Sequence, residues 1–207
     1  MNLKILKPQG NHKVKAQNAG DEKFVIRLAR AGQDEAKGQL TRLYLNRAYR
    51  FALRLTQNRH DAEELVRAAF AELFQNLTRY DESFAFSAWF YQIIIHQYLK
   101  LRRKRRLLAG IFPFFLKDTI DPDAFESPGD SPGIALTQKE EKKILLKAIR
   151  KLPQAQQLTV TLYDLEGLPQ KEIAEILEIP AAEVMSRLHS GRQKLLESLT
   201  HYLKENG

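Results

Sequence analysis

Apolar residues recur at helical spacing along most of the chain. The pattern begins after Asp21, is interrupted at Gly32 and resumes over residues 36–55. A further series over 62–77 forms an almost unbroken apolar seam. A seam of this kind is typical of a helix that packs one face against a core, so the first half of the chain is predicted to be a helical domain.

The start of the 62–77 seam carries an N-terminal capping pattern. A break is expected at 57–60, and Asp61 is placed to cap the following helix. Glu64 stands three residues later, in the arrangement of a capping box.

Residues 79–92 hold six of the nineteen aromatic residues of the chain, and a basic run follows at 100–106. A basic run alone usually marks a solvated face. Aromatic residues leading into basic ones indicate a different chemistry, because bases stack on aromatic rings while cations hold the phosphates of a single strand. The segment is therefore a candidate site for single-stranded nucleic acid.

Two short helices joined by a tight turn follow Gly167, which is placed to end the helix predicted over 154–165. The first helix is predicted over 170–177, and Pro180 prevents it from continuing. The second helix is predicted over 181–199, with Glu183, Ser186, Arg187, Ser190 and Lys194 on its polar face. This arrangement is typical of a helix-turn-helix that reads a major groove, although an ordinary hairpin of a helical bundle has a similar pattern.

The charge of the chain favours a polyanionic partner. The formal net charge is +8 and the isoelectric point is near 9.6, which suits nucleic acid or a membrane surface. Residues 1–106 carry 21 basic and 10 acidic residues, whereas 144–207 carry 8 of each. The positive charge is thus concentrated in the N-terminal half and is absent, on balance, from the helix-turn-helix half.

Several function classes are disfavoured by composition. The chain has no cysteine, and its five histidines are scattered, so no metal site is expected. No paired carboxylates, glycine-rich phosphate loop or nucleophile and base pattern is present, so neither catalytic residues nor a cofactor is expected. Residues 1–20 lack the apolar core of a signal peptide, and the apolar run at 107–116 is too short to cross a bilayer. These features predict a cytoplasmic protein without membrane insertion.

The sequence thus predicts an all-α protein with two helical domains joined by a flexible acidic linker. A basic mobile tail is expected over 1–20, an N-terminal domain over 21–106, a linker over 107–137 and a helix-turn-helix domain over 138–207. Within the linker, the apolar stretch 111–116 is expected either to pack back on a domain or to contact a partner.

The order of these parts resembles bacterial RNA polymerase sigma factors of the extracytoplasmic-function group, which join a region-two domain to a region-four domain. The resemblance spans 21–106 and 144–199. It is carried in order by Asp61-Ala62-Glu63-Glu64-Leu65-Val66, Phe86 through Trp89-Phe90-Tyr91, Leu152-Pro153, Leu165-Glu166-Gly167-Leu168, Glu172-Ile173-Ala174 and Ser186-Arg187-Leu188-His189.

The resemblance implies three binding surfaces. Docking on core RNA polymerase is expected from Asp61, Glu63, Glu64, Val66, Arg67 and Phe70. Capture of the melted minus-ten promoter strand is expected from Tyr80, Phe84, Phe86, Trp89, Tyr91, His96, Lys100, Arg102, Arg103, Arg105 and Arg106, with stacking assigned to Tyr80, Phe84 and Phe86 in preference to Trp89. Binding of the minus-thirty-five duplex is expected from Lys171, Ala182, Glu183, Ser186, Arg187, Ser190 and Arg192.

The chain departs from the family pattern in its helix-turn-helix. Glu178 stands where the turn usually has glycine, which costs about 1 kcal/mol if that position is left-handed. Glu183 and Met185 stand where the second helix usually has threonine and lysine. The promoter sequence therefore does not transfer from the family to this chain.

The leading hypothesis is a promoter-recognition subunit that acts when bound to core RNA polymerase, with promoter DNA as duplex and as melted strand. An anti-sigma factor is a further partner that the resemblance allows. The alternative is a stand-alone helix-turn-helix transcriptional regulator. Such a regulator would need neither the aromatic and basic segment nor a neutral C-terminal half.

Overall fold

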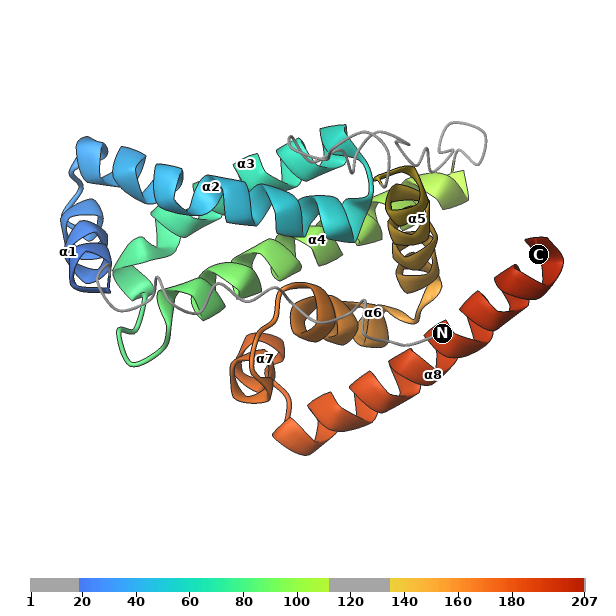
Figure 1. Cartoon of the computed structure of the whole chain (residues 1–207). Helices are drawn as coiled ribbons and strands as arrows, with labels where there is room; N and C mark the ends of the chain where they lie inside the picture. The colour runs from blue at the N-terminus through green and yellow to red at the C-terminus, as the bar shows by residue number, and fades with distance from the viewer. Residues whose placement is uncertain (1–18, 112–134, 207) are drawn as a thin grey trace. The chain divides into compact units, whose positions relative to one another are not determined.

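A computed structural model describes residues 19–111 and 135–206 (Figure 1). Within these ranges all regular secondary structure is helical. The chain divides between residues 121 and 122 into two compact units. Most of the predicted tail and linker, including 112–116 of the apolar stretch, lies outside the described residues. Helix α4 continues to Ile111, five residues beyond the predicted end of the N-terminal domain.

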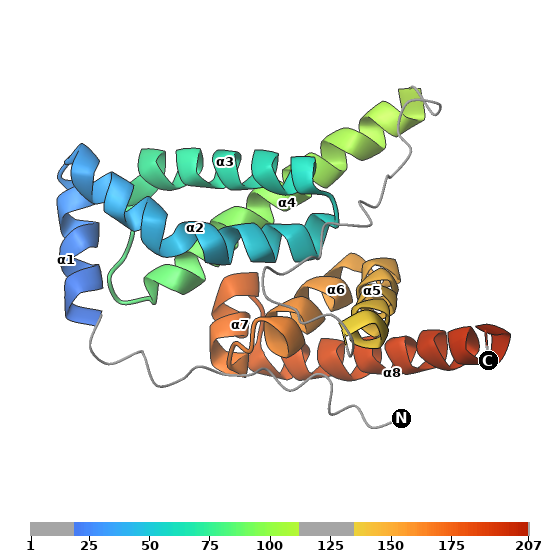
Figure 2. The same ribbon diagram turned by 45° about the horizontal axis from the view of Figure 1, so that its top comes forward.

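The N-terminal unit is a bundle of helices in which α2 packs on α3 and α3 on α4, while α1 packs against α2 (Figures 1 and 2). Its core includes Leu40, Phe51, Leu73 and Ile94, which are fully buried. The elements are α1 (Ala19–Arg30), α2 (Asp34–Thr56), α3 (Arg59–Asn76), the single 3-10 turn η3 (Leu77–Arg79) and α4 (Phe86–Ile111).

Two tight turns connect the first three helices. Gly32, at φ 91°, separates α1 from α2 as its position predicts, because glycine adopts positive φ at little cost. Gln57 ends α2 in the left-handed region at φ 53°. The cap of α3 is Asn58, whose side chain accepts a hydrogen bond from the backbone N–H of Asp61 at 3.0 Å. The capping role predicted for Asp61 is therefore wrong, because the helix begins two residues before it.

The C-terminal unit is built around the long helix α8, against which α5, α6 and α7 pack. Helix α8 passes close to α6 at Gly191, where a Cβ atom would lie 2.9 Å from Cγ2 of Val160. Only glycine fits there without moving a neighbour. The elements are α5 (Ala135–Lys151), α6 (Gln154–Val160), the π-helical turn η4 (Thr161–Leu165), α7 (Gln170–Leu177) and α8 (Ala181–Asn206).

The turn between α7 and α8 confirms the predicted helix-turn-helix geometry. Glu178 is left-handed, with φ 54° and ψ 44°, so the strain expected at this glycine-like position is present. Ile179 donates its N–H to the carbonyl of Ala174 at 3.0 Å, and Pro180 precedes α8. Val184 and Leu188 then bury the inner face of α8.

Candidate nucleic-acid and polymerase interfaces

The aromatic segment divides into buried rings and one exposed ring. Tyr80, Phe86 and Tyr91 are 7%, 5% and 3% exposed, whereas Phe84 is 53% exposed. The Tyr80 and Phe86 rings meet edge to face with centroids 5.1 Å apart, and the partly exposed Trp89 lies against Tyr80 at 5.1 Å. Base stacking on Tyr80 or Phe86, and contact of the melted strand with the Tyr91 ring, would therefore have to displace core packing. Phe84 remains the accessible ring.

Local hydrogen bonds shape the loop that presents Phe84. The Tyr80 hydroxyl donates to the carbonyl of Phe84 at 2.6 Å. The carboxylate of Asp81 accepts from the N–H of Ser83 at 2.9 Å, which lowers the pKa of Asp81. These bonds hold both ends of the loop 80–85 and leave the Phe84 ring outside the core.

Helix α1 contacts both this loop and the turn η3 that precedes it. Arg27 donates to the carboxylate of Glu82 at 2.9 Å, and Arg30 donates to the carbonyl of Thr78 at 2.7 Å. The hydrogen bond from Arg27 lowers the pKa of Glu82. We call this set of contacts the α1 latch. It brings together residues about fifty positions apart, and sequence reasoning missed it because nothing local in the pattern marks such pairs.

The basic run on α4 is only partly available to a nucleic acid. Arg103, Lys104 and Arg106 are exposed, as is His96 about two to three turns earlier on the helix. Lys100 lies 3.4 Å from the carboxylate of Glu72, and the guanidinium of Arg102 lies 5.8 Å from the centre of the Tyr98 ring.

Within this run, Arg105 forms an ion pair with a buried carboxylate. It forms an ion pair with Asp61, whose side chain is only 4% exposed. A buried carboxylate needs such a partner. The Arg105 guanidinium neutralises a charge inside the unit, so the predicted contact of Arg105 with DNA would compete with this ion pair.

The predicted polymerase-docking residues lie on two faces of α3, one exposed and one buried. Glu63, Glu64 and Arg67 are exposed. Val66 and Phe70 are 5% and 8% exposed, and the Phe70 ring packs against Phe90 at 4.9 Å. Asp61, Val66 and Phe70 face the interior and stabilise the helix that carries the exposed residues, so the exposed three are the ones placed for direct contact with a partner.

Both arginines of α8 form ion pairs with carboxylates of the C-terminal unit. Arg187 donates to the carboxylate of Glu183 at 2.8 Å, one helical turn away. Arg192 donates to the buried Asp164 and lies 5.2 Å from the centre of the Tyr163 ring. The hydrogen bond to Asp164 raises the pKa of Arg192. The Arg192 side chain thus ties α8 to the turn before α7, and its predicted contact with the upstream element would compete with this ion pair.

The remaining predicted residues of this unit lie at its surface. Lys171, Ala182, Glu183 and Ser186 are exposed and Ser190 is half-buried. Two further residues of α8 share this exposure, Met185 at 49% and His189. Neither was assigned to a site, although their spacing from Ala182 by three and seven residues places them on one helical face.

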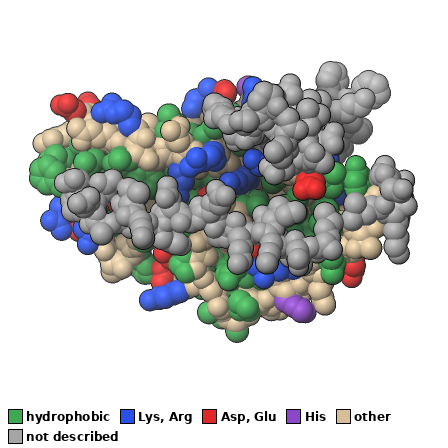
Figure 3. All heavy atoms as spheres, viewed as in Figure 1, with side chains coloured by type: hydrophobic (Ala, Val, Ile, Leu, Met, Phe, Trp, Pro, Cys, Tyr) green, Lys and Arg blue, Asp and Glu red, His purple; other side chains and the backbone are tan. Residues whose placement is uncertain are grey.

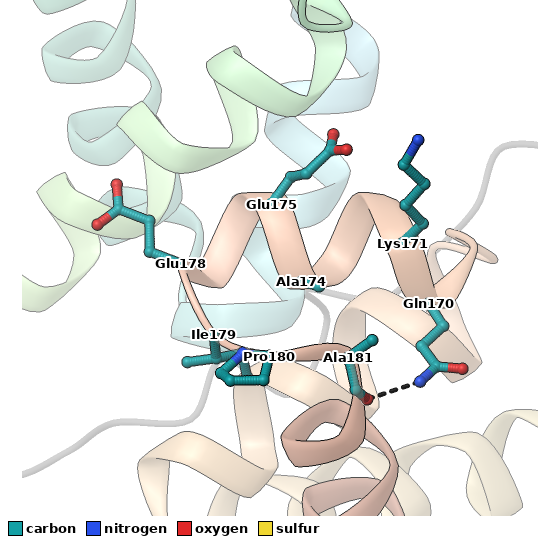
Figure 4. A pocket seen from close by; sticks show the side chains of 8 residues that line it. All are labelled: Gln170, Lys171, Ala174, Glu175, Glu178, Ile179, Pro180 and Ala181. Atoms are coloured by element: carbon teal, nitrogen blue, oxygen red, sulfur yellow. Dashed lines mark hydrogen bonds between the residues drawn. The ribbon is translucent and has the colours of Figure 1, made fainter.

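An open cavity of about 650 Å³ lies over α7, the turn and the first residue of α8 (Figure 4). Gln170 donates from its side chain to the carbonyl of Ala181 at 2.6 Å, which joins the starts of the two helices. Lys171, Glu175 and Glu178 point away from α8 (Figure 4). With two carboxylates and one ammonium group, the cavity lining favours neither a cation nor an anion.

On the face drawn in Figure 3, the Lys and Arg side chains of the described residues form several separate groups. Among the described residues no helix is both long and apolar enough to cross a membrane. The same residues contain no group of three or more histidine and acidic side chains placed to hold a metal ion.

Each of the two units matches a known protein family. The family described as Sigma-70 region 2 matches residues 40–107, and the family described as Sigma-70, region 4 matches residues 142–195. Together they cover more than half of the chain.

Two curated relatives extend the likeness across both units. The chain is 29% identical over 169 residues to the extracytoplasmic-function (ECF) RNA polymerase sigma factor SigE of Mycolicibacterium smegmatis, covering 81% of this chain and 63% of that protein. It is 27% identical over 181 residues to the ECF RNA polymerase sigma factor SigW of Bacillus subtilis, covering 84% of this chain and 94% of that protein.

A solved structure agrees in fold. The sigma factor RpoE of Bartonella quintana, determined in complex with the anti-sigma factor NepR, matches with a TM-score of 0.65 and 20% identity. The match covers 79% of this chain and 96% of that one. With two matching sigma-70 regions in the family's order, the chain belongs to the extracytoplasmic-function group of sigma factors, the family of subunits that direct RNA polymerase to promoters for transcription initiation.

Proposed function

We propose that this chain binds core RNA polymerase, captures the melted minus-ten strand through the loop 80–85 and contacts the upstream duplex through α8. The observation that carries the proposal is Phe84, an aromatic ring 53% exposed on a loop that hydrogen bonds hold in place. An exposed ring on a fixed loop is a stacking platform that needs little ordering when a base arrives.

The cations of α4 support the same role. Arg103, Lys104 and Arg106 are exposed at the far end of the helix that starts at Phe86. A helix rises about 1.5 Å per residue, so these cations stand roughly 25–30 Å along α4 from its start. A strand that stacks on Phe84 and follows α4 would meet phosphate-neutralising charge at the other end.

Docking on polymerase is proposed through the exposed face of α3. Glu63, Glu64 and Arg67 offer charged groups there, and the buried pair of Asp61 with Arg105 fixes the first turn of α3 against α4. A rigid helix face with charged groups suits recognition by a partner surface of complementary charge.

The upstream contact is proposed to be weak by itself. Residues 144–207 carry no net charge, and Arg187 is paired with Glu183, whereas duplex binding draws most of its affinity from phosphate neutralisation. Tethering by polymerase would raise the effective concentration of α8 at the promoter. An anti-sigma partner stays a prediction, and no catalytic role is proposed.

Run-off transcription with core polymerase from the organism that encodes the chain tests the proposal. We expect the protein to co-elute with core enzyme and to start specific transcripts from that organism's DNA. Absence of both would overturn it. Tight, sequence-specific binding of an upstream duplex without polymerase would support a stand-alone regulator instead.

A further inference from the structure

The outward face of the first turns of α8 carries two exposed apolar side chains beside the polar Glu183, Ser186 and His189. Ala182 and Met185 stand three residues apart and are both exposed, Met185 at 49%. Residues three apart on a helix are neighbours on one face. The two side chains therefore form one apolar patch at the end of the helix that a helix-turn-helix directs toward base edges.

In this structure, neither arginine of α8 is free to make the common bidentate contact with a guanine beside this patch. Arg187 is held by Glu183 at 2.8 Å, and Arg192 is held by Asp164 and Tyr163. A bidentate arginine contact to guanine needs a guanidinium free to reach N7 and O6. In this structure, apolar contact through Ala182 and Met185 is thus one recognition chemistry that the start of α8 offers without breaking an ion pair.

The major-groove edges of the four bases carry one apolar group, the 5-methyl of thymine. The thioether side chain of methionine is flexible and polarisable, and it adapts well to a small apolar surface. We propose that Met185, supported by Ala182, packs on the methyl group of a thymine in the upstream promoter element and so selects a T·A pair at that position. This inference rests on the proposed function, since it names what α8 reads.

The test uses the complete chain with core polymerase. Promoter-length duplexes enriched by the holoenzyme from a randomised pool define the upstream element, and each thymine in it is then replaced by deoxyuridine. Loss of one methyl contact should weaken binding about fourfold at one position, as expected for one buried methyl group. In a second duplex set with cytosine at that position, 5-methylcytosine should bind more tightly than cytosine.

Variants assign the effect to the side chain. M185A should abolish the difference between thymine and deoxyuridine, while M185L should retain it, because leucine keeps an apolar side chain of similar volume. Unchanged helicity would show that both variants fold. A deoxyuridine effect of equal size in M185A overturns the inference, as does its absence in the wild type. If the holoenzyme enriches no sequence, the proposed function fails first, and the two failures are thereby distinguished.

Discussion

Arg192 on α8 donates two hydrogen bonds to the carboxylate of Asp164 in the π-helical turn before α7, one of them at 3.1 Å. The Asp164 side chain is 3% exposed, whereas that of Arg192 is 40% exposed. The pair therefore joins the second helix of the helix-turn-helix to the segment that precedes the first.

Removing the arginine should destabilise the C-terminal unit. We expect Arg192→Ala to lower its free energy of unfolding by about 2–3 kcal/mol, because a buried carboxylate loses its partner while part of the cost is relieved by solvent. Urea unfolding of the full chain can separate the units, since Trp89 is the single tryptophan and lies in the N-terminal unit. The circular dichroism transition should shift while the Trp89 fluorescence transition does not. Arg192→Lys, which keeps the charge, should lose less.

A substitution at the left-handed Glu178 should instead stabilise the C-terminal unit. Replacing it with glycine should stabilise the C-terminal unit by about 1 kcal/mol, because a side chain at φ 54° is strained and glycine is not. Thermal unfolding followed by circular dichroism measures the change. Gln57→Gly is the matched control, since Gln57 is also left-handed but its side chain is fully buried. That variant should destabilise the N-terminal unit, and a gain there would contradict the reasoning.

Phe84 and its buried neighbour Phe86 should respond differently to alanine. We expect Phe84→Ala to reduce promoter melting by about tenfold, the loss of one stacked base, without changing unfolding. Phe86→Ala should instead lower stability by about 3–5 kcal/mol as a core truncation. Permanganate reactivity of promoter thymines in the holoenzyme measures melting, and unfolding of the free protein measures stability. Equal melting by wild type and a folded Phe84→Ala protein would remove the role given to this ring.

The α1 latch should matter for melting more than for folding. Arg27→Glu places two acidic residues together and should reduce the yield of melted promoter, because Glu82 then leaves its position in the loop. The reversed pair, Arg27→Glu with Glu82→Arg, should restore it. Both residues are exposed, so salt should weaken the wild-type effect. A reversed pair that melts no better than the single variant would show that these charges do not position the loop.

Glu183 should limit the affinity of α8 for DNA. Glu183→Gln frees Arg187 from its partner at 2.8 Å and removes a negative charge beside the phosphates. We expect tighter binding of upstream duplexes of any sequence by the holoenzyme, with the salt dependence of log K steeper by about one unit. Titration at several salt concentrations measures this slope. In the Arg187→Ala background the same change should leave the slope almost unaltered.

The local pattern of the chain determined its helices, the turn before Pro180 and the division into two helical domains. Helical periodicity and turn residues act over a few positions, so their effects can be read without knowing what packs where. The helix-turn-helix was predictable for this reason, and its helices begin at Gln170 and Ala181 as the pattern indicates.

The tertiary structure decided which members of each predicted site are available. Tyr80 and Phe86 are as aromatic as Phe84, but both are buried: their rings pack against each other, and Phe86 also packs against Tyr44 of α2. Arg105 and Asp61 are 44 residues apart, and Arg192 and Asp164 are 28 apart. A charge pair between distant segments leaves no periodic trace in the sequence. Composition therefore predicts where binding surfaces lie, and only the packing of the helices separates the exposed groups from those that hold the units together.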